Sequence, residues 1–318
     1  MTEQAAGAPS SSGRAPGAGS VHGSPDEPHG GSRDEPLCAQ ARALAAAPGA
    51  DPDEHHEDLV ALLRRALASG EASAPGLLAD AHLDRGERRE AVEVLTRAVH
   101  ARGRSDLAGM LGETLAAVGD HEAAEAAFLV GLDGGHPDAM NDYGVFLRGR
   151  GRTQEAGYVL DRAARLGDDL APLNLVALHL EELDDPATAT ELAERLHDEA
   201  KPSTLVALAD CRLAAERVEE AGELYRRAAE GGGACAHIYY GWFLRDRHDD
   251  RAGAEEQLRR AHEVGEPGAA FHLARFLFDH GRPDEALPYF EEAAWHGDPD
   301  AVAVLEAEYR GLVDEYDD

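Results

Sequence analysis

The chain has 318 residues, in which 62 acidic side chains outnumber 30 basic ones and give a net charge of −32. This charge repels a phosphate backbone and an anionic membrane surface, so it argues against nucleic-acid and membrane binding but permits a basic partner. Aromatic residues make up only 5% of the chain, so we expect a core of Ala, Leu and Val built by helices.

Cysteine spacing and hydropathy bear on where the protein works. Cys38, Cys211 and Cys235 are odd in number, widely spaced and without a CxxC pair, so they form neither a disulfide framework nor a metal-binding pair. No apolar run approaches the roughly 20 residues of a membrane-spanning helix. No charged segment followed by an apolar run marks a secretory signal at the N-terminus. We therefore expect a cytoplasmic protein.

The N-terminal part of the chain divides into two segments. Residues 1–36 are Gly, Ser, Pro, Ala and acidic residues with almost nothing apolar, so we expect a disordered tail. Helical patterning begins near Leu37, and a turn rich in Pro, Gly and Asp interrupts it. Residues 37–70 therefore predict a degenerate first helical hairpin.

An alanine recurs at a spacing of 32 or 33 residues through residues 71–297. The seven positions are Ala91, Ala124, Ala156, Ala189, Ala221, Ala254 and Ala286. Gly or Ala precedes each of them by 12 positions, or by 13 in the sixth unit, and a larger residue follows four positions later in most units. Two antiparallel helices approach closely only where the crossing side chains are small. The pattern therefore predicts seven helix-turn-helix units.

This pattern of a small residue, x11, Ala, x3, a larger residue, x2 and Ala resembles the tetratricopeptide repeat. The linking segments RAARLGDDLAPL, RAAEGGGACA and EAAWHGDPDA are also similar to Sel1-like repeats. The resemblance implies an all-α, right-handed superhelical α-solenoid of antiparallel helix pairs, with residues 298–318 as a capping helix and acidic end. The fourth unit departs from the pattern, because Asp184 replaces the turn glycine and Ala193 the bulky residue. Arginine greatly outnumbers lysine, which is typical of a GC-rich, actinobacterial-like bacterial genome.

Motifs that could carry chemistry are weak throughout the chain. The GRG fragment at 149–151 has no preceding strand, so it is not a dinucleotide-binding loop. The HEAAE segment at 121–125 lacks the second histidine of a zinc-protease helix. The His55–His56 pair lies among carboxylates. A solvated acidic turn explains this segment more simply than a weak metal site does. We predict no catalytic residues, no cofactor and no metal site.

The resemblance also implies a binding surface on the first helix of each unit, which lines the concave wall. Positions −3, +1 and +4 from the small residue share one helical face there. The partner-binding candidates chosen from this set are Asn141, Arg148, Asn174, Ile238, Trp242, Arg245, Phe271, Arg275 and Phe278. Aromatic residues gather in the last two units, where they either form a hot spot with the arginines or fill a C-terminal core.

Three functions follow from these observations in order of preference. The first is a protein-interaction scaffold that binds a protein or peptide, with a basic one permitted by the charge, on the C-terminal part of the concave wall. The second is a regulatory sensor, in which a bound peptide changes the curvature of the superhelix. The third, an enzyme, has no nucleophile and base to support it.

Overall fold

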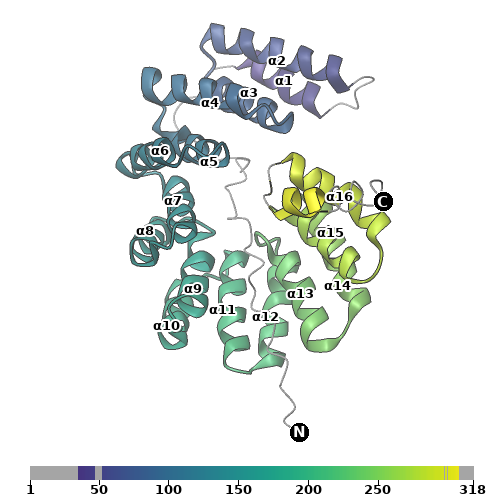
Figure 1. The fold of residues 1–318 in the computed structure, drawn as a ribbon. Coiled ribbons are helices and arrows are strands. Elements are labelled where there is room, and N and C mark those ends of the chain that lie inside the picture. Colours follow the sequence, from purple (N-terminus) through teal and green to yellow (C-terminus); the bar gives the residue numbers. More distant parts are fainter. Residues whose placement is uncertain (1–34, 47–51, 297, 299, 308–318) are drawn as a thin grey trace.

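A computed structural model describes residues 35–46, 52–296, 298 and 300–307. Of the predicted tail 1–36, residues 1–34 lie outside this part, and Pro36 already belongs to the first helix. The described residues form helices and no strand. Consecutive helices pair into antiparallel hairpins that stack along the chain (Figure 1). The prediction of an all-α solenoid of helix-turn-helix repeats is confirmed.

The first hairpin consists of α1 (Pro36–Ala45) and α2 (Pro52–Ser69). A short π-helix η1 (Arg97–Ala101) and a 3-10 turn η2 (Ser105–Leu107) separate the second hairpin from the third. The seven hairpins after the first are α3/α4 (Ala74–Asp84, Arg88–Thr96), α5/α6 (Ala108–Ala117, His121–Gly134), α7/α8 (Pro137–Gly149, Thr153–Arg165), α9/α10 (Ala171–Glu181, Pro186–Leu196), α11/α12 (Pro202–Ala214, Val218–Glu230), α13/α14 (Ala236–His248, Arg251–Glu263) and α15/α16 (Ala269–Asp279, Pro283–Trp295).

The recurring alanines lie where the two helices of each hairpin cross. All seven, from Ala91 to Ala286, are 0% exposed. The small residue on the facing helix accommodates the larger side chain of the unit: a Cβ added at Gly112 would lie 2.6 Å from the Phe128 ring, and one at Gly144 would lie 2.5 Å from Leu160. Hairpins that carry the larger residue therefore close by interlocking a small and a large side chain, as the spacing predicts, whereas the fourth unit has Ala193 in place of the larger residue.

The turn inside each hairpin needs a residue in the left-handed backbone region. Glycine supplies it at Gly151, for example, with φ 72°. In the fourth unit Asp184 takes the same conformation with φ 49°. Aspartate tolerates this region better than most residues, so Asp184 keeps the left-handed position of the turn. The hydrogen bonds around it differ, because the Asp185 N–H donates to the carbonyl of His179, six positions back, whereas in the third unit the Arg152 N–H donates to that of Leu147, five positions back.

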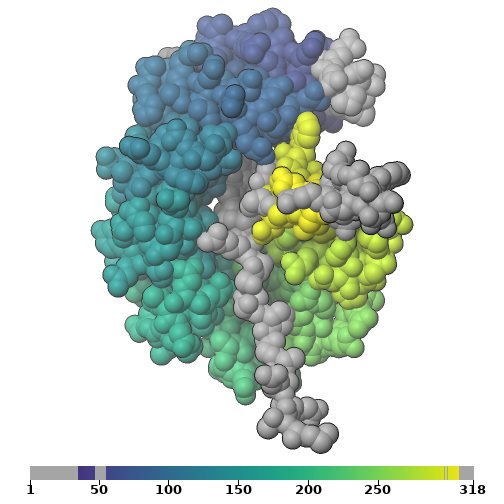
Figure 2. Space-filling model, viewed as in Figure 1, coloured from purple at the N-terminus to yellow at the C-terminus, as the bar shows by residue number. Residues whose placement is uncertain are grey.

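The stack of hairpins bends until its two ends meet. In Figure 1 the chain runs from the first hairpins down one side, across the bottom and up the other side, so that α16 lies beside α3 and α4. The two ends touch in the space-filling view of Figure 2. Trp295 Nε1 donates a hydrogen bond to the backbone carbonyl of Asp84 across 211 positions of sequence. The superhelix thus completes most of one turn.

The C-terminal segment continues the stack beyond α16. Residues 300–307 are helical and bury Ala301 in the last core cluster. Of the predicted capping segment 298–318, residues 299 and 308–318 lie outside the described residues. Among the described helices, none combines the length and the apolar character that crossing a bilayer requires.

Candidate binding surface

Carboxylates gather on the first helices of the hairpins. Figure 1 shows α5, α7 and α9 on the inner side of the superhelix, with α6, α8 and α10 outside them. We call six residues the acidic wall, and they come from α5, α7, the turn before α9, α9 itself and α11. They are Glu113, Asp138, Asp142, Asp168, Glu181 and Asp210.

The N-terminal half of the acidic wall is a group of like charges. Burial, followed by repulsion from Asp138, raises the pKa of Glu113 to about 7. Burial and then repulsion from Glu113 raise the pKa of Asp142 well above its usual value. Burial also raises the pKa of Asp168 to about 6, although two backbone N–H groups at the start of α9 donate to this carboxylate. These carboxylates therefore lie in a partly dehydrated region of negative potential.

The C-terminal half of the acidic wall consists of Glu181 and Asp210. Burial raises the pKa of Asp210 to about 7, and Glu181 adds repulsion, while the Tyr225 hydroxyl donates a hydrogen bond of 2.5 Å that opposes the shift. Asp210 and Glu181 also contribute to raising the pKa of Tyr239 on α13, although burial is the main cause. The negative potential therefore extends from α9 across α11 to α13.

Three predicted site residues meet in one polar chain on α7 and α9. Asn174 donates from Nδ2 to Oδ1 of the fully buried Asn141 at 2.7 Å. Arg148 reaches the Asn174 carbonyl at 3.5 Å and forms ion pairs with Glu181 at 3.3 Å and Glu182 at 2.9 Å. The structure thus brings Asn141, Asn174 and Arg148 together beside the acidic wall.

The candidates in the sixth unit are occupied by contacts within the chain. Trp242 Nε1 donates to Nδ1 of His272 at 3.0 Å, and the Arg245 guanidinium stacks 3.9 Å from the centre of the indole. Burial lowers the pKa of His272 to about 4, so its neutral ring accepts this hydrogen bond. Trp242 is half-buried, and its edge and one face already have partners.

The remaining candidates divide by exposure. Ile238 and Phe271 are only 4% and 3% exposed and pack in the C-terminal core, so in this conformation they support the wall and do not face a ligand. Arg275 is exposed and pairs with Asp279 at 3.4 Å. Phe278 is 41% exposed, with its ring against Phe290. The C-terminal aromatic residues thus fill a core more than they form an open face.

Three carboxylates at the +1 position from the small residue are not among the binding candidates predicted from the sequence. Asp80, Glu113 and Asp210 occupy the +1 position of the first, second and fifth units. Burial raises the pKa of Asp80 to about 6, so all three are strongly perturbed carboxylates. The signal was the recurrence of an acidic residue at one repeat position, which the high acidic content of the chain concealed.

Two groups of side chains contain metal-ligand types. His56, His82 and Glu87 place one ligand atom each within 4.8 Å of the others, and His82 Nδ1 lies 2.6 Å from Glu87 Oε2. The second group is Glu35, Cys38 and Glu71, in which the Glu71 carboxylate accepts the Cys38 backbone N–H at the start of α1. Imidazole and carboxylate suit zinc, whereas the Glu71 contact is explained as a helix cap. The absence of a metal site stays a prediction.

The family comparison bears directly on these hairpins. The tetratricopeptide repeat family matches residues 77–136, 110–171 and 244–302. The chain contains tetratricopeptide repeats. These ranges cover hairpins at both ends of the tetratricopeptide array, including α5 and α7 of the acidic wall. A search of curated protein sequences gives no match.

Comparison with solved structures bears on the fold. Yeast Tom70 superposes with a TM-score of 0.55 at 16% identity, over 91% of this chain and 66% of the Tom70 chain. PilF of Pseudomonas aeruginosa gives 0.43 at 23% identity, over 65% of this chain and 96% of its own. Human IFIT1, solved as a dimer with PPP-AAAA, gives 0.48 at 14% identity, over 81% and 72%. This chain thus spans just under two thirds of the length of Tom70, and at 16% identity the likeness shows the fold alone.

Proposed function

We propose that this tetratricopeptide protein is an interaction scaffold whose acidic wall binds a basic peptide or a basic partner helix. Tetratricopeptide repeats are typical of scaffolds that bind proteins or peptides, which supports the general class. The observation that carries the specific proposal is the gathering of six carboxylates in the acidic wall, where burial and repulsion from neighbouring carboxylates raise the pKa values of Asp142 and Asp210. Lysine or arginine side chains placed among these carboxylates favour their charged form and offset the repulsion between them.

This proposal moves the binding surface relative to the sequence prediction. Asn141, Asn174 and Arg148 stay within it, because they border Glu181. Trp242 and Phe278 lie on α13 and α15, at the end of the wall, where we expect them to contribute apolar contacts to the same partner. Nucleic acid, membranes and catalysis stay outside the proposal, as do a cofactor and a metal. The cytoplasmic location, the bacterial origin and the Sel1-like linkers remain expectations.

A fluorescein-labelled peptide with alternating lysine and alanine tests the proposal by fluorescence anisotropy. We expect the variant Glu113→Gln with Asp210→Asn to weaken binding about tenfold. Each lost charge pair should weaken it by about threefold or more, and the two factors multiply. The matched control is Glu223→Gln with Glu263→Gln, which removes two charges from the outer helices α12 and α14. Equal weakening by both variants means that only net charge matters, and this contradicts a specific concave site.

The contact between the ends of the superhelix favours a second candidate function, a conformational sensor. Trp295 on α16 bonds to Asp84 at the end of α3, so a ligand that changes the rotation between repeats must strain or break this contact. Small-angle scattering with and without the lysine peptide measures the change. An increase in the radius of gyration on binding, reproduced by Trp295→Ala alone, supports the sensor; an unchanged radius leaves the rigid scaffold.

A further inference from the structure

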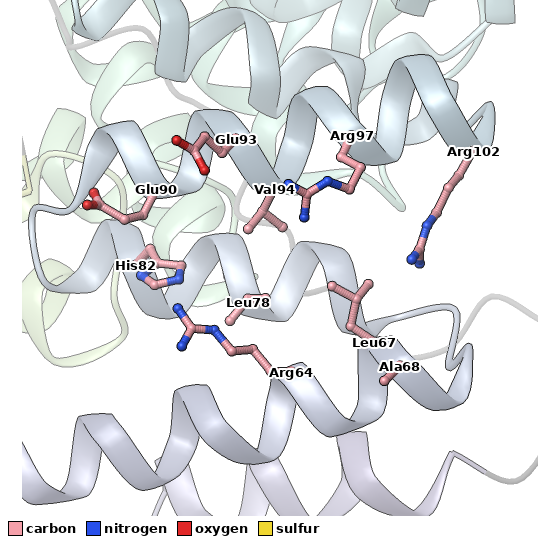
Figure 3. Close-up of a pocket in the computed structure, with 10 residues that line it drawn as sticks. All are labelled: Arg64, Leu67, Ala68, Leu78, His82, Glu90, Glu93, Val94, Arg97 and Arg102. Atoms are coloured by element: carbon pink, nitrogen blue, oxygen red, sulfur yellow. The ribbon is translucent and has the colours of Figure 1, made fainter.

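A groove lies between the second helices of the first two hairpins. Its walls are α2 on one side and α4 with η1 on the other, and α3 forms the floor (Figure 3). The cavity has a volume of about 390 Å³. Leu67, Leu78 and Val94 line its apolar part, while Arg64, Arg97 and Arg102 come from both walls. Three guanidinium groups and an aliphatic floor thus share one groove in a strongly acidic protein.

These arginines differ from most others in the chain because they lack acidic partners among the described residues. Eight arginines lie in the segment from Arg42 to Arg102. Seven of them form no ion pair with a described residue, and Arg85 is not counted among these seven. From Arg104 to Arg282, fifteen of eighteen form one with a described residue. The chain has twice as many acidic as basic residues, so most arginines can find an acidic partner. Three arginines in one groove without an ion pair to a described residue therefore indicate positive charge that a ligand can neutralise.

The backbone at the groove is also irregular. The helix α4 ends at Thr96 and continues as the π-helix η1, which carries Arg97 at its first position. Arg102 follows directly after η1, and Gly103 takes φ 68° to turn the chain away. A π-helix is rare and is often found at functional sites, because the widened turn re-aims side chains. Here it places Arg97 and Arg102 along the same wall.

We propose that this groove is a second docking site, for an acidic amphipathic segment of a partner protein. Carboxylates of such a segment pair with Arg64, Arg97 and Arg102, and its apolar side chains cover Leu67 and Leu78. Glu90 and Glu93 line the far end of the groove and disfavour a phosphate backbone, which carries negative charge along its whole length. The site is separate from the acidic wall and takes a ligand of opposite charge.

The test uses the full chain and a fluorescein-labelled peptide of about 15 residues, with leucines on one helical face and glutamates elsewhere. The groove variant is Arg64→Glu with Arg97→Glu. The matched control is Arg65→Glu with Arg89→Glu, two exposed arginines of the same helices α2 and α4 that do not line the groove. We expect the groove variant to weaken anisotropy-measured binding about tenfold or more and the control to change it less than about threefold.

Three results overturn the proposal. They are no binding of the glutamate peptide by the wild type, equal weakening by both variants, or tighter binding of a single-stranded oligonucleotide than of the peptide. Circular dichroism of both variants shows whether the helices survive. Binding of the lysine peptide should persist in the groove variant, so failure here leaves the acidic wall untouched.

Discussion

Replacing Phe128 by alanine is expected to lower the free energy of unfolding by about 3–5 kcal/mol. Phe128 on α6 is 1% exposed, and its ring centre lies 5.6 Å from that of Tyr143 and 5.3 Å from that of Phe146. It joins the second hairpin of the repeat array to the third. Because neighbouring repeats stabilise one another only through such contacts, the cavity weakens both units.

Because Gly112 packs against Phe128, the effect of Gly112→Ala on stability should change sign when Phe128 is removed. Gly112→Ala alone should destabilise the protein by about 1–3 kcal/mol, because its Cβ would lie 2.6 Å from the Phe128 ring. In the Phe128→Ala background the same change should become neutral or stabilising, since the space is then open and alanine favours the helix by about 1 kcal/mol over glycine.

Chemical denaturation followed by circular dichroism measures all four proteins of this cycle. Gly76→Ala on α3 is the control, because an added Cβ there meets Leu107 at an ordinary 3.5 Å and should stabilise by about 0.5–1 kcal/mol. If Gly112→Ala costs the same free energy with and without Phe128, the two side chains are not coupled and the proposed interlock is wrong.

The variant Glu113→Gln with Asp210→Asn should be more stable than the wild type at pH 8, by about 1–3 kcal/mol. Both carboxylates have a pKa raised to about 7 in the folded protein, from 4.5 and 3.8. At a pH between the unfolded-state and folded-state pKa values, the folded protein binds more protons than the unfolded protein. The stability due to these groups therefore falls as the pH rises through this range. The neutral amides escape this loss, and the amide introduced at position 210 would still accept the hydrogen bond from Tyr225.

Thermal unfolding of both proteins from pH 5 to pH 8 checks this prediction. The difference in stability should be small at pH 5 and grow as the pH rises towards 7, with a plateau above it. Taking the difference cancels groups shared by both proteins, such as His272, whose lowered pKa acts in the opposite sense. A difference that is constant with pH, or one that favours the wild type at pH 8, would show that the two carboxylates are fully charged and unstrained.

The repeat architecture could be predicted because local rules decide it. Ala91 and its successors each report a helix crossing within a single hairpin, and the crossing needs only residues about 12 positions apart. The same locality explains why Asp184 could take the left-handed position of a glycine while only the hydrogen bonds of its own turn differ. Packing at short range therefore leaves a clear periodic trace in the sequence.

The binding surface could be predicted only in part, because it depends on contacts between units. Asn141 and Asn174 share a repeat position, and the structure joins them, but the pKa of Asp210 depends on Tyr225 and Glu181 from two other helices. Whether Phe271 faces the wall or the core follows from how Phe290 packs. Even less visible is the contact of Trp295 with Asp84, which sums the small rotations of all the intervening hairpins.

The most direct test of the account is carboxyl footprinting of the full chain with and without the lysine peptide. Esterification of carboxyl groups with a diazo ester, which does not couple them to the lysines of the peptide, followed by mass spectrometry reports the accessibility of each carboxylate. We expect the peptide to protect Glu113, Asp168 and Asp210, while Glu223 and Glu263 on the outer helices stay labelled. Protection confined to the outer helices, or spread evenly over the chain, would contradict a basic partner bound on the acidic wall.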